Sequence, residues 1–88
     1  MPLYIISYDL KKPDRDYTGL FEAIKGFDGW WHYLESTWIV KTGDDPNQIW
    51  EKLKPHIDEN DNLLIIEAGK ERQGWLPKKA WDWIRNNL

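Results

Sequence analysis

The most constraining feature of the sequence is a segment near its start that is apolar on two alternating faces. Residues 3–9 place Leu3, Ile5 and Ser7 on one face and Tyr4, Ile6 and Tyr8 on the other. Alternation with a period of two predicts a β-strand. Because both of its faces are mostly apolar, we expect this strand in the middle of a sheet that is covered on both sides.

Three later segments have the spacing of amphipathic helices. The first follows a predicted cap at Asp16 and repeats apolar residues at i, i+3, i+4 and i+7. The second begins with Asp45 as cap and Pro46 at its first helical position, and Pro55 is expected to kink or end it. The third spans residues 77–87 and starts at a proline.

Two further regions favour strands. Residues 30–42 are rich in aromatic and β-branched side chains. We expect a short strand, a tight reversal near Glu35 and a second strand, and one bent strand fits almost as well because no Asn-Gly or Asp-Gly turn is present. Residues 63–68 predict a last strand.

The order strand, helix, strand, strand, helix, strand predicts an α+β protein with a ferredoxin-like βαββαβ antiparallel sheet and an extra C-terminal helix. Residues 1–88 then form a single domain, with its core in 3–68 and a C-terminal helical extension at 75–88. The first and third strands are central in this topology. Two helices cover only one sheet face, so a second copy of the chain or the C-terminal helix must cover the other.

Composition narrows the class of protein. The chain has 88 residues and no cysteine, but it has seven tryptophans, and so small a core predicts stabilisation by a homodimer. The net charge of −3 argues against strong non-specific binding to nucleic acid, although a local basic patch can still bind. With no basic-then-apolar leader and no long apolar run, we expect a cytoplasmic protein with no membrane association.

The antiparallel order also predicts which residues meet at the end of the first strand. Neighbouring strands begin where the first one ends, so Asp9 is expected near the reversal at Glu35, near Ser36 and Thr37, and near Asp61. Two roles fit Asp9: it is a ligand of Mg²⁺ or Mn²⁺ shared with a second copy, or it is a strand-end aspartate that bonds the following turn.

Basic and polar residues surround that aspartate. Lys11, Lys12 and Arg15 are candidate contacts for phosphate, and hence for RNA or DNA. Ser36 and Thr37 are candidate supports for Asp9 or for a phosphate, with hydrogen bonding inside the sheet as the default. His32 is either a general base or a hydrogen-bonded sheet residue, and its surroundings favour the second role.

The tail is the most basic region of the chain. Its basic residues are Lys70, Arg72, Lys78, Lys79 and Arg85. They form either a contact for nucleic acid or only a solvent-exposed face.

Three motifs resemble a known family. Tyr4–Leu10, His32–Trp38 and Ile57–Asp61 are similar to segments of the short bacterial proteins called the SinR family, which are related to the CRISPR-associated Cas-two proteins and to virulence-associated protein D. The resemblance covers residues 3 to about 68. It leaves the C-terminal helix unexplained.

The resemblance implies a ferredoxin-like homodimer and a function. In the Cas-two family the aspartate that matches Asp9 is repeated across the two-fold axis as a metal ligand for cleaving RNA or DNA, while other members are non-catalytic scaffolds on duplex DNA. This chain departs from the family at two places. Leu34 stands where the family usually has a glutamine, and of the arginines that commonly start the family's first helix, Arg15 alone remains. The resemblance thus implies a metal-dependent endoribonuclease or toxin-type nuclease. The alternative is a non-catalytic dimeric nucleic-acid- or protein-binding module, which these two departures and the acidic balance favour.

Overall fold

The computed structural model describes residues 1–12 and 14–88, and Pro13 of the predicted first loop lies outside them. Along the chain the elements are β1 (Leu3–Asp9), α1 (Thr18–Lys25), β2 (Gly29–Leu34), β3 (Thr37–Lys41), α2 (Pro46–Leu53), a short 3₁₀ turn (Lys54–His56), β4 (Asn62–Ala68) and α3 (Lys78–Asn87). The chain is thus a small α+β protein, as predicted.

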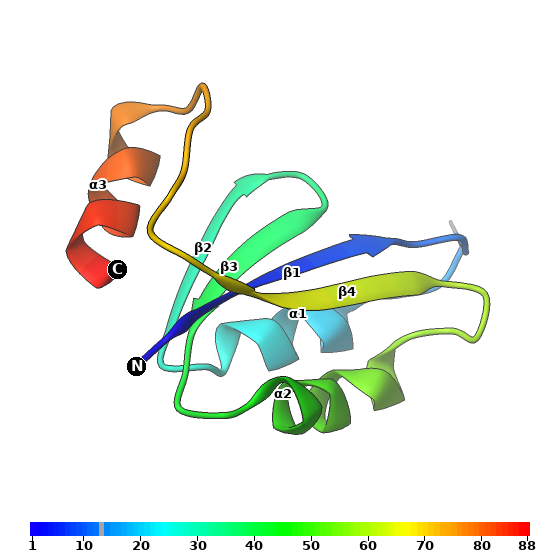
Figure 1. Cartoon of the computed structure of the whole chain (residues 1–88). Coiled ribbons are helices and arrows are strands. Elements are labelled where there is room, and N and C mark those ends of the chain that lie inside the picture. The colour runs from blue at the N-terminus through cyan, green and yellow to red at the C-terminus, as the bar shows by residue number, and fades with distance from the viewer. Residues whose placement is uncertain (13) are drawn as a thin grey trace.

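The four strands form one antiparallel sheet in the order β2-β3-β1-β4. The first and third strands are central, as the predicted order of elements requires. α1 and α2 lie together on one side of the sheet, and α3 lies on the other side at one end (Figure 1). The arrangement is compatible with a ferredoxin-like fold.

Local sequence signals explain most element ends. Residues 29–41 form two strands joined by a reversal at 35–36, not one bent strand, and the pairing is irregular between Trp31 and Leu34. Asp45 caps α2 in a reciprocal pair with Gln48, and α2 ends before Pro55. The predicted cap at Asp16 is wrong by one residue. Tyr17 occupies the cap position, and Asp16 accepts a 2.9 Å bond from the Thr18 N–H.

The main core lies between the sheet and the first two helices. One face of the sheet supplies Tyr4, Ile6, Tyr8, Trp38 and Val40, and the helices supply Leu20, Ile24, Ile49 and Leu53. Along β1 and β3, the side chains that enter this core alternate with side chains that point to the opposite face of the sheet, because the strand repeat is two residues. The helices α1 and α2 therefore cover the face of β1 that carries Tyr4, Ile6 and Tyr8.

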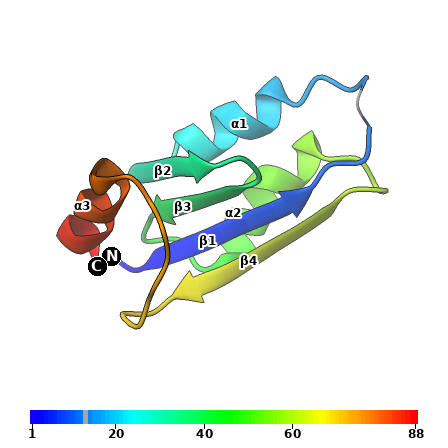
Figure 2. The ribbon, with the colours of Figure 1, turned by 90° about the horizontal axis from the view of Figure 1, so that it is seen from above.

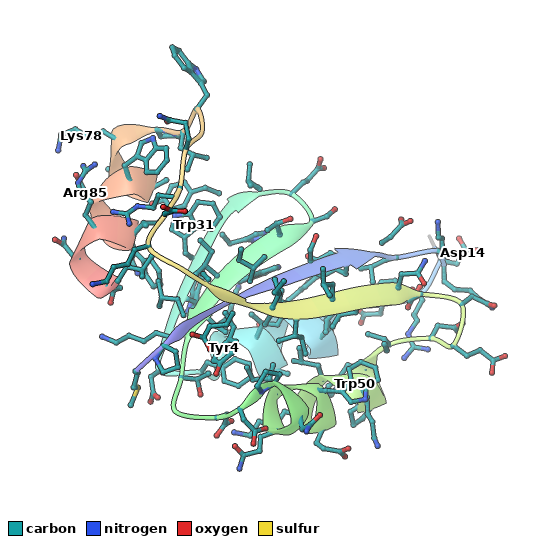
Figure 3. All side chains as sticks on the ribbon, viewed as in Figure 1. Tyr4, Asp14, Trp31, Trp50, Lys78 and Arg85 are labelled. Carbon is teal, nitrogen blue, oxygen red and sulfur yellow. The ribbon has the colours of Figure 1, made fainter. Side chains whose placement is uncertain are left out.

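α3 covers part of the opposite face through a second, smaller cluster. Trp31 of β2 is 2% exposed, packs with Ala80 and Ile84, and donates an indole N–H bond of 3.1 Å to the Ala80 carbonyl. Trp31 points from the sheet toward α3 in Figure 3. Seen from above, α3 lies beside β2, and the linker from β4 crosses to reach it (Figure 2).

Residues 1–12 and 14–88 leave the rest of that face uncovered, and we call it the open face. Strand pairing places Ile5 beside Ile66, Ser7 beside Leu64 and Asp9 beside Asn62 on this face. Leu64 and Ile66 are 57% and 51% exposed. The cluster under the C-terminal helix thus reaches from β2 to Ile39 of β3, and the Leu64 and Ile66 side chains of β4 remain in contact with solvent.

Candidate functional site

Asp9 ends β1 at the place where the sequence predicts that several segments meet. Asn62, at the start of β4, pairs with Asp9 in the sheet. The Tyr8 N–H donates a 3.1 Å bond to the carbonyl of Ser36, and the Tyr8 hydroxyl lies 3.5 Å from the carbonyl of Glu35. The predicted gathering of the β2–β3 reversal and the start of β4 around the end of β1 is therefore confirmed.

The Asp9 carboxylate is exposed and ion-paired. Its side chain is 63% exposed, and Oδ2 lies 2.6 Å from the Nζ of Lys11. Over residues 1–12 and 14–88, no cluster of three or more His, Cys, Asp or Glu side chains is arranged to hold a metal. One copy of the chain thus contributes a single carboxylate at this position, and a hard divalent cation normally takes six or more oxygen ligands.

The hydroxyl groups predicted to support Asp9 bond mainly within the sheet. Thr37 Oγ1 lies 3.2 Å from Ser7 Oγ, and the two residues pair across β1 and β3. Ser36 is exposed, and its carbonyl is used by β1. Beside them is a shallow depression of about 270 Å³ that includes Ser7, Asp9 and Leu64 in its lining. Asp9, Ser7 and Thr37 therefore share one end of the open face.

Two of the three predicted phosphate contacts already have carboxylate partners. Lys11 pairs with Asp9, as above, and Arg15 Nη1 lies 3.7 Å from Asp58 Oδ2 while its guanidinium carbon lies 5.6 Å from the centre of the Tyr17 ring. Lys12 is exposed. The basic character of this end is thus reduced by neighbouring acids, and binding of phosphate here requires these ion pairs to open.

Asp61 accepts the most hydrogen bonds of the carboxylates in this region, and no separate role for it is predicted from the sequence. Asp61 is 9% exposed. Its Oδ1 accepts bonds from the Lys11 N–H (2.7 Å) and the Tyr17 hydroxyl (2.9 Å), and its Oδ2 accepts from the Asp58 N–H (2.8 Å). Asp61 therefore joins the β1–α1 loop, the start of α1 and the turn before β4.

These contacts set the protonation state of Asp61. Burial alone would raise the pKa of Asp61, but the N–H donors of Lys11 and Asp58, the Tyr17 hydroxyl and the charge of Arg15 together hold that pKa below its usual value. Burial, and then the bond to Asp61, raises the pKa of Tyr17. The Asp61 carboxylate is ionised, and both of its oxygens accept hydrogen bonds from the chain itself. Its role is therefore structural.

His32 has the geometry of a hydrogen-bonded sheet residue. Its ring stacks on the Trp38 indole, with centroids 3.7 Å apart and planes 11° apart, and Nε2 lies 3.1 Å from the Glu35 carbonyl. Trp38 in turn donates a 2.9 Å bond to the Tyr8 hydroxyl. This chain of contacts fixes the β2–β3 reversal next to the end of β1. It supports the structural role favoured for His32.

Comparisons with other proteins bear on neither family nor function. In the part of the chain that the structure describes, no helix has the length and apolar character to cross a bilayer. The family suggested by the three sequence motifs remains a prediction, because comparison of the chain with family models, curated proteins and solved structures gave no match.

Proposed function

We propose that the chain works as a ferredoxin-like homodimer of the Cas-two type, joined through the open face, and that its Asp9 end acts on nucleic acid. The observation that carries the proposal is the exposure of Leu64 and Ile66, at 57% and 51%, next to Ile5 in the middle of a sheet face. Contiguous exposed apolar side chains on a small protein mark an interaction surface.

A second copy of the chain is the cover that fits this face best. Sheets pack face to face at about 10 Å, with their apolar side chains interdigitated. A two-fold axis through the open face would let the Ile5, Leu64 and Ile66 side chains of one protomer meet those of its partner, which is the isologous contact of most homodimers. α3 covers only the side of Trp31, so it leaves room for such a partner.

The catalytic form of the proposal uses Asp9. Alternation along β1 puts Asp9 on the same face as Ser7 and Ile5, so a dimer of this kind would place two Asp9 side chains at its interface. Carboxylate oxygens are the ligands that Mg²⁺ and Mn²⁺ prefer, and a bound ion of this type would polarise a phosphodiester and activate water. Thr37 and Ser7 supply neighbouring hydroxyls, and Lys11, once released, supplies a charge for phosphate.

A second candidate is a non-catalytic dimer that binds nucleic acid or protein. The 2.6 Å ion pair with Lys11 favours it, because a carboxylate that is neutralised within its own chain has less need of a metal. The two forms share the dimer and differ only in whether Asp9 exchanges Lys11 for a cation. An assay of oligomeric state tests the dimer that both forms share, and an assay of cleavage separates the two forms.

Leu64→Lys is expected to turn the dimer into a monomer. Each copy places this side chain in the apolar interface, where a lysine would be buried without a partner, whereas the isolated protomer tolerates it on a surface that is 57% exposed. Sedimentation of the wild type should give twice the mass of the chain, and that of the variant should give the chain mass. Glu22→Gln makes the same change in charge on exposed α1 and should stay dimeric. A monomeric wild type would refute the dimer.

Asp9→Ala is expected to abolish metal-dependent cleavage without unfolding the protein. The carboxylate is exposed, and an ion pair of this kind contributes at most about 1 kcal/mol to stability. Labelled RNA and DNA are incubated with wild type, Asp9→Ala and the control Asp14→Ala, with and without Mg²⁺ or Mn²⁺. Cleavage that persists in Asp9→Ala would exclude the catalytic form. A dimer that cleaves neither substrate would leave the binding form.

A further inference from the structure

The linker after β4 and α3 form a groove lined by cations, which we call the tail groove. Its lining, around a hollow of about 430 Å³, is Lys70, Arg72, Gln73, Trp81 and Arg85. Three cationic side chains, one amide and one indole therefore face the same space. None of these residues belongs to the open face or to its end with Asp9, Ser7 and Thr37.

The tail groove is a positive region on a negative protein. Five Lys and Arg side chains and two acidic ones give residues 69–88 a net charge of +3, whereas residues 1–68 carry −6. The ends of the molecule differ accordingly. Figure 3 shows Lys78 and Arg85 on α3 at one end and Asp14 at the other. A polyanion would therefore be attracted to the tail and repelled by much of the remaining surface.

The cations of the tail groove are only partly neutralised. Asp82 bonds both Lys78 (2.8 Å) and Arg85 (2.6 Å), so one carboxylate serves two cations. Within the described ranges, Lys70 and Arg72 form no ion pair, and Arg72 Nη1 donates a 2.9 Å bond to the Lys70 carbonyl. That bond holds the guanidinium close to the linker backbone. The groove thus has free positive charge at defined positions.

Aromatic side chains accompany those charges. Trp81 lines the groove, and the linker backbone comes close to it, because a Cβ built on Gly74 would lie 3.7 Å from the Trp81 ring. The next residue, Trp75, is 99% exposed. A fully exposed indole stabilises nothing within the chain, but it offers a flat surface to a ligand that stacks.

We propose that the tail groove binds single-stranded nucleic acid, with phosphates on Lys70, Arg72 and Arg85 and bases stacked on Trp75 and Trp81. Cations that follow a backbone together with aromatic platforms are the combination used for single strands. A duplex keeps its bases stacked on one another and offers none to an indole. An acidic peptide would use the charges but not the exposed ring of Trp75. The proposal uses no residue of the Asp9 end and holds whether or not that end cleaves.

The test is the binding of a fluorescein-labelled 15-nucleotide oligo(dT) or oligo(U) to the full chain, followed by fluorescence anisotropy. Wild type should bind, and raising the salt from about 50 to about 200 mM should weaken binding strongly, because phosphate contacts release counterions. Trp75→Ala should weaken binding about tenfold, as expected for the loss of one stacked base. Lys70→Gln/Arg72→Gln should weaken binding and reduce its salt dependence.

Controls make the outcome decisive. Lys52→Gln/Lys54→Gln removes the same two charges from exposed positions at the end of α2 and should bind like wild type. Wild-type binding that survives both tail variants would overturn the proposal, and so would a poly-glutamate peptide of equal length that binds as tightly without needing Trp75. Cleavage tests the catalytic form at Asp9, whereas binding that depends on Lys70, Arg72 and Trp75 tests the tail groove, so either proposal can fail alone.

Discussion

Asp61→Ala is expected to lower the free energy of unfolding by about 3 kcal/mol. The substitution leaves the Lys11 N–H, the Asp58 N–H and the Tyr17 hydroxyl without their acceptor, the two N–H groups at partly buried positions and the hydroxyl at a buried one. A buried donor that loses its partner keeps the full cost of its lost hydration. Urea unfolding at pH 7, followed by circular dichroism, measures the change.

Two variants show whether the network or a single bond carries that effect. Tyr17→Phe removes one donor and leaves Asp61 with its two backbone partners, so a loss of about 1 kcal/mol is expected. Asp44→Ala is the matched control. Asp44 pairs with the exposed Lys52 side chain, so its loss should change stability by under about 1 kcal/mol. Equal effects of Asp61→Ala and Asp44→Ala would contradict the structural role of Asp61.

Because the pKa of Asp61 is lowered, the loss of stability expected for Asp61→Ala depends on pH. The folded protein binds this proton less readily than the unfolded chain, whose aspartates titrate near about pH 4. The contribution of Asp61 is therefore complete above that pH and is lost as the pH falls through the lower folded value. The difference between wild type and Asp61→Ala should be constant above about pH 5 and shrink in more acidic solution.

The fold could be predicted from the sequence because its signals are local and mutually consistent. The doubly apolar segment Leu3–Asp9 specified a central strand, and Asp45 with Pro46 specified the start of α2. The hairpin of β2 and β3 was harder to predict because its reversal at 35–36 lacks a typical turn pair. That reversal is held in part by a long-range contact, from the Tyr8 hydroxyl to the Glu35 carbonyl 27 positions away, which no local pattern reveals.

The candidate site was predicted in position but not in detail. The strand order alone brings Asp9, Thr37 and Asp61 to one end of the sheet. The sequence could not show that Lys11 turns back onto Asp9, nor that the backbone N–H of the same Lys11 is bound by Asp61, 50 positions away. Asp61 differs from the other acids of its turn only in burial and in its partners. Those are properties of the folded chain.

Trp31→Ala is expected to release α3 while leaving the sheet folded. Trp31 is 2% exposed and belongs to the small cluster with Ala80 and Ile84, which is separate from the main core under α1 and α2. The substitution removes both that packing and the bond to the Ala80 carbonyl. A helix of ten residues is not stable alone in water, so α3 should unfold once it loses this contact.

Amide hydrogen exchange resolves this local event. In Trp31→Ala the amides of α3 should exchange at rates close to those of an unstructured chain, and the amides of β1 should keep their protection. Trp75→Ala, at a fully exposed position of the linker, should leave both sets of rates unchanged. An equal loss of protection in α3 and β1 would show that the two clusters unfold as one unit. If α3 alone is released, Trp81 and Arg85 leave the tail groove, and oligonucleotide binding should weaken with the sheet still intact.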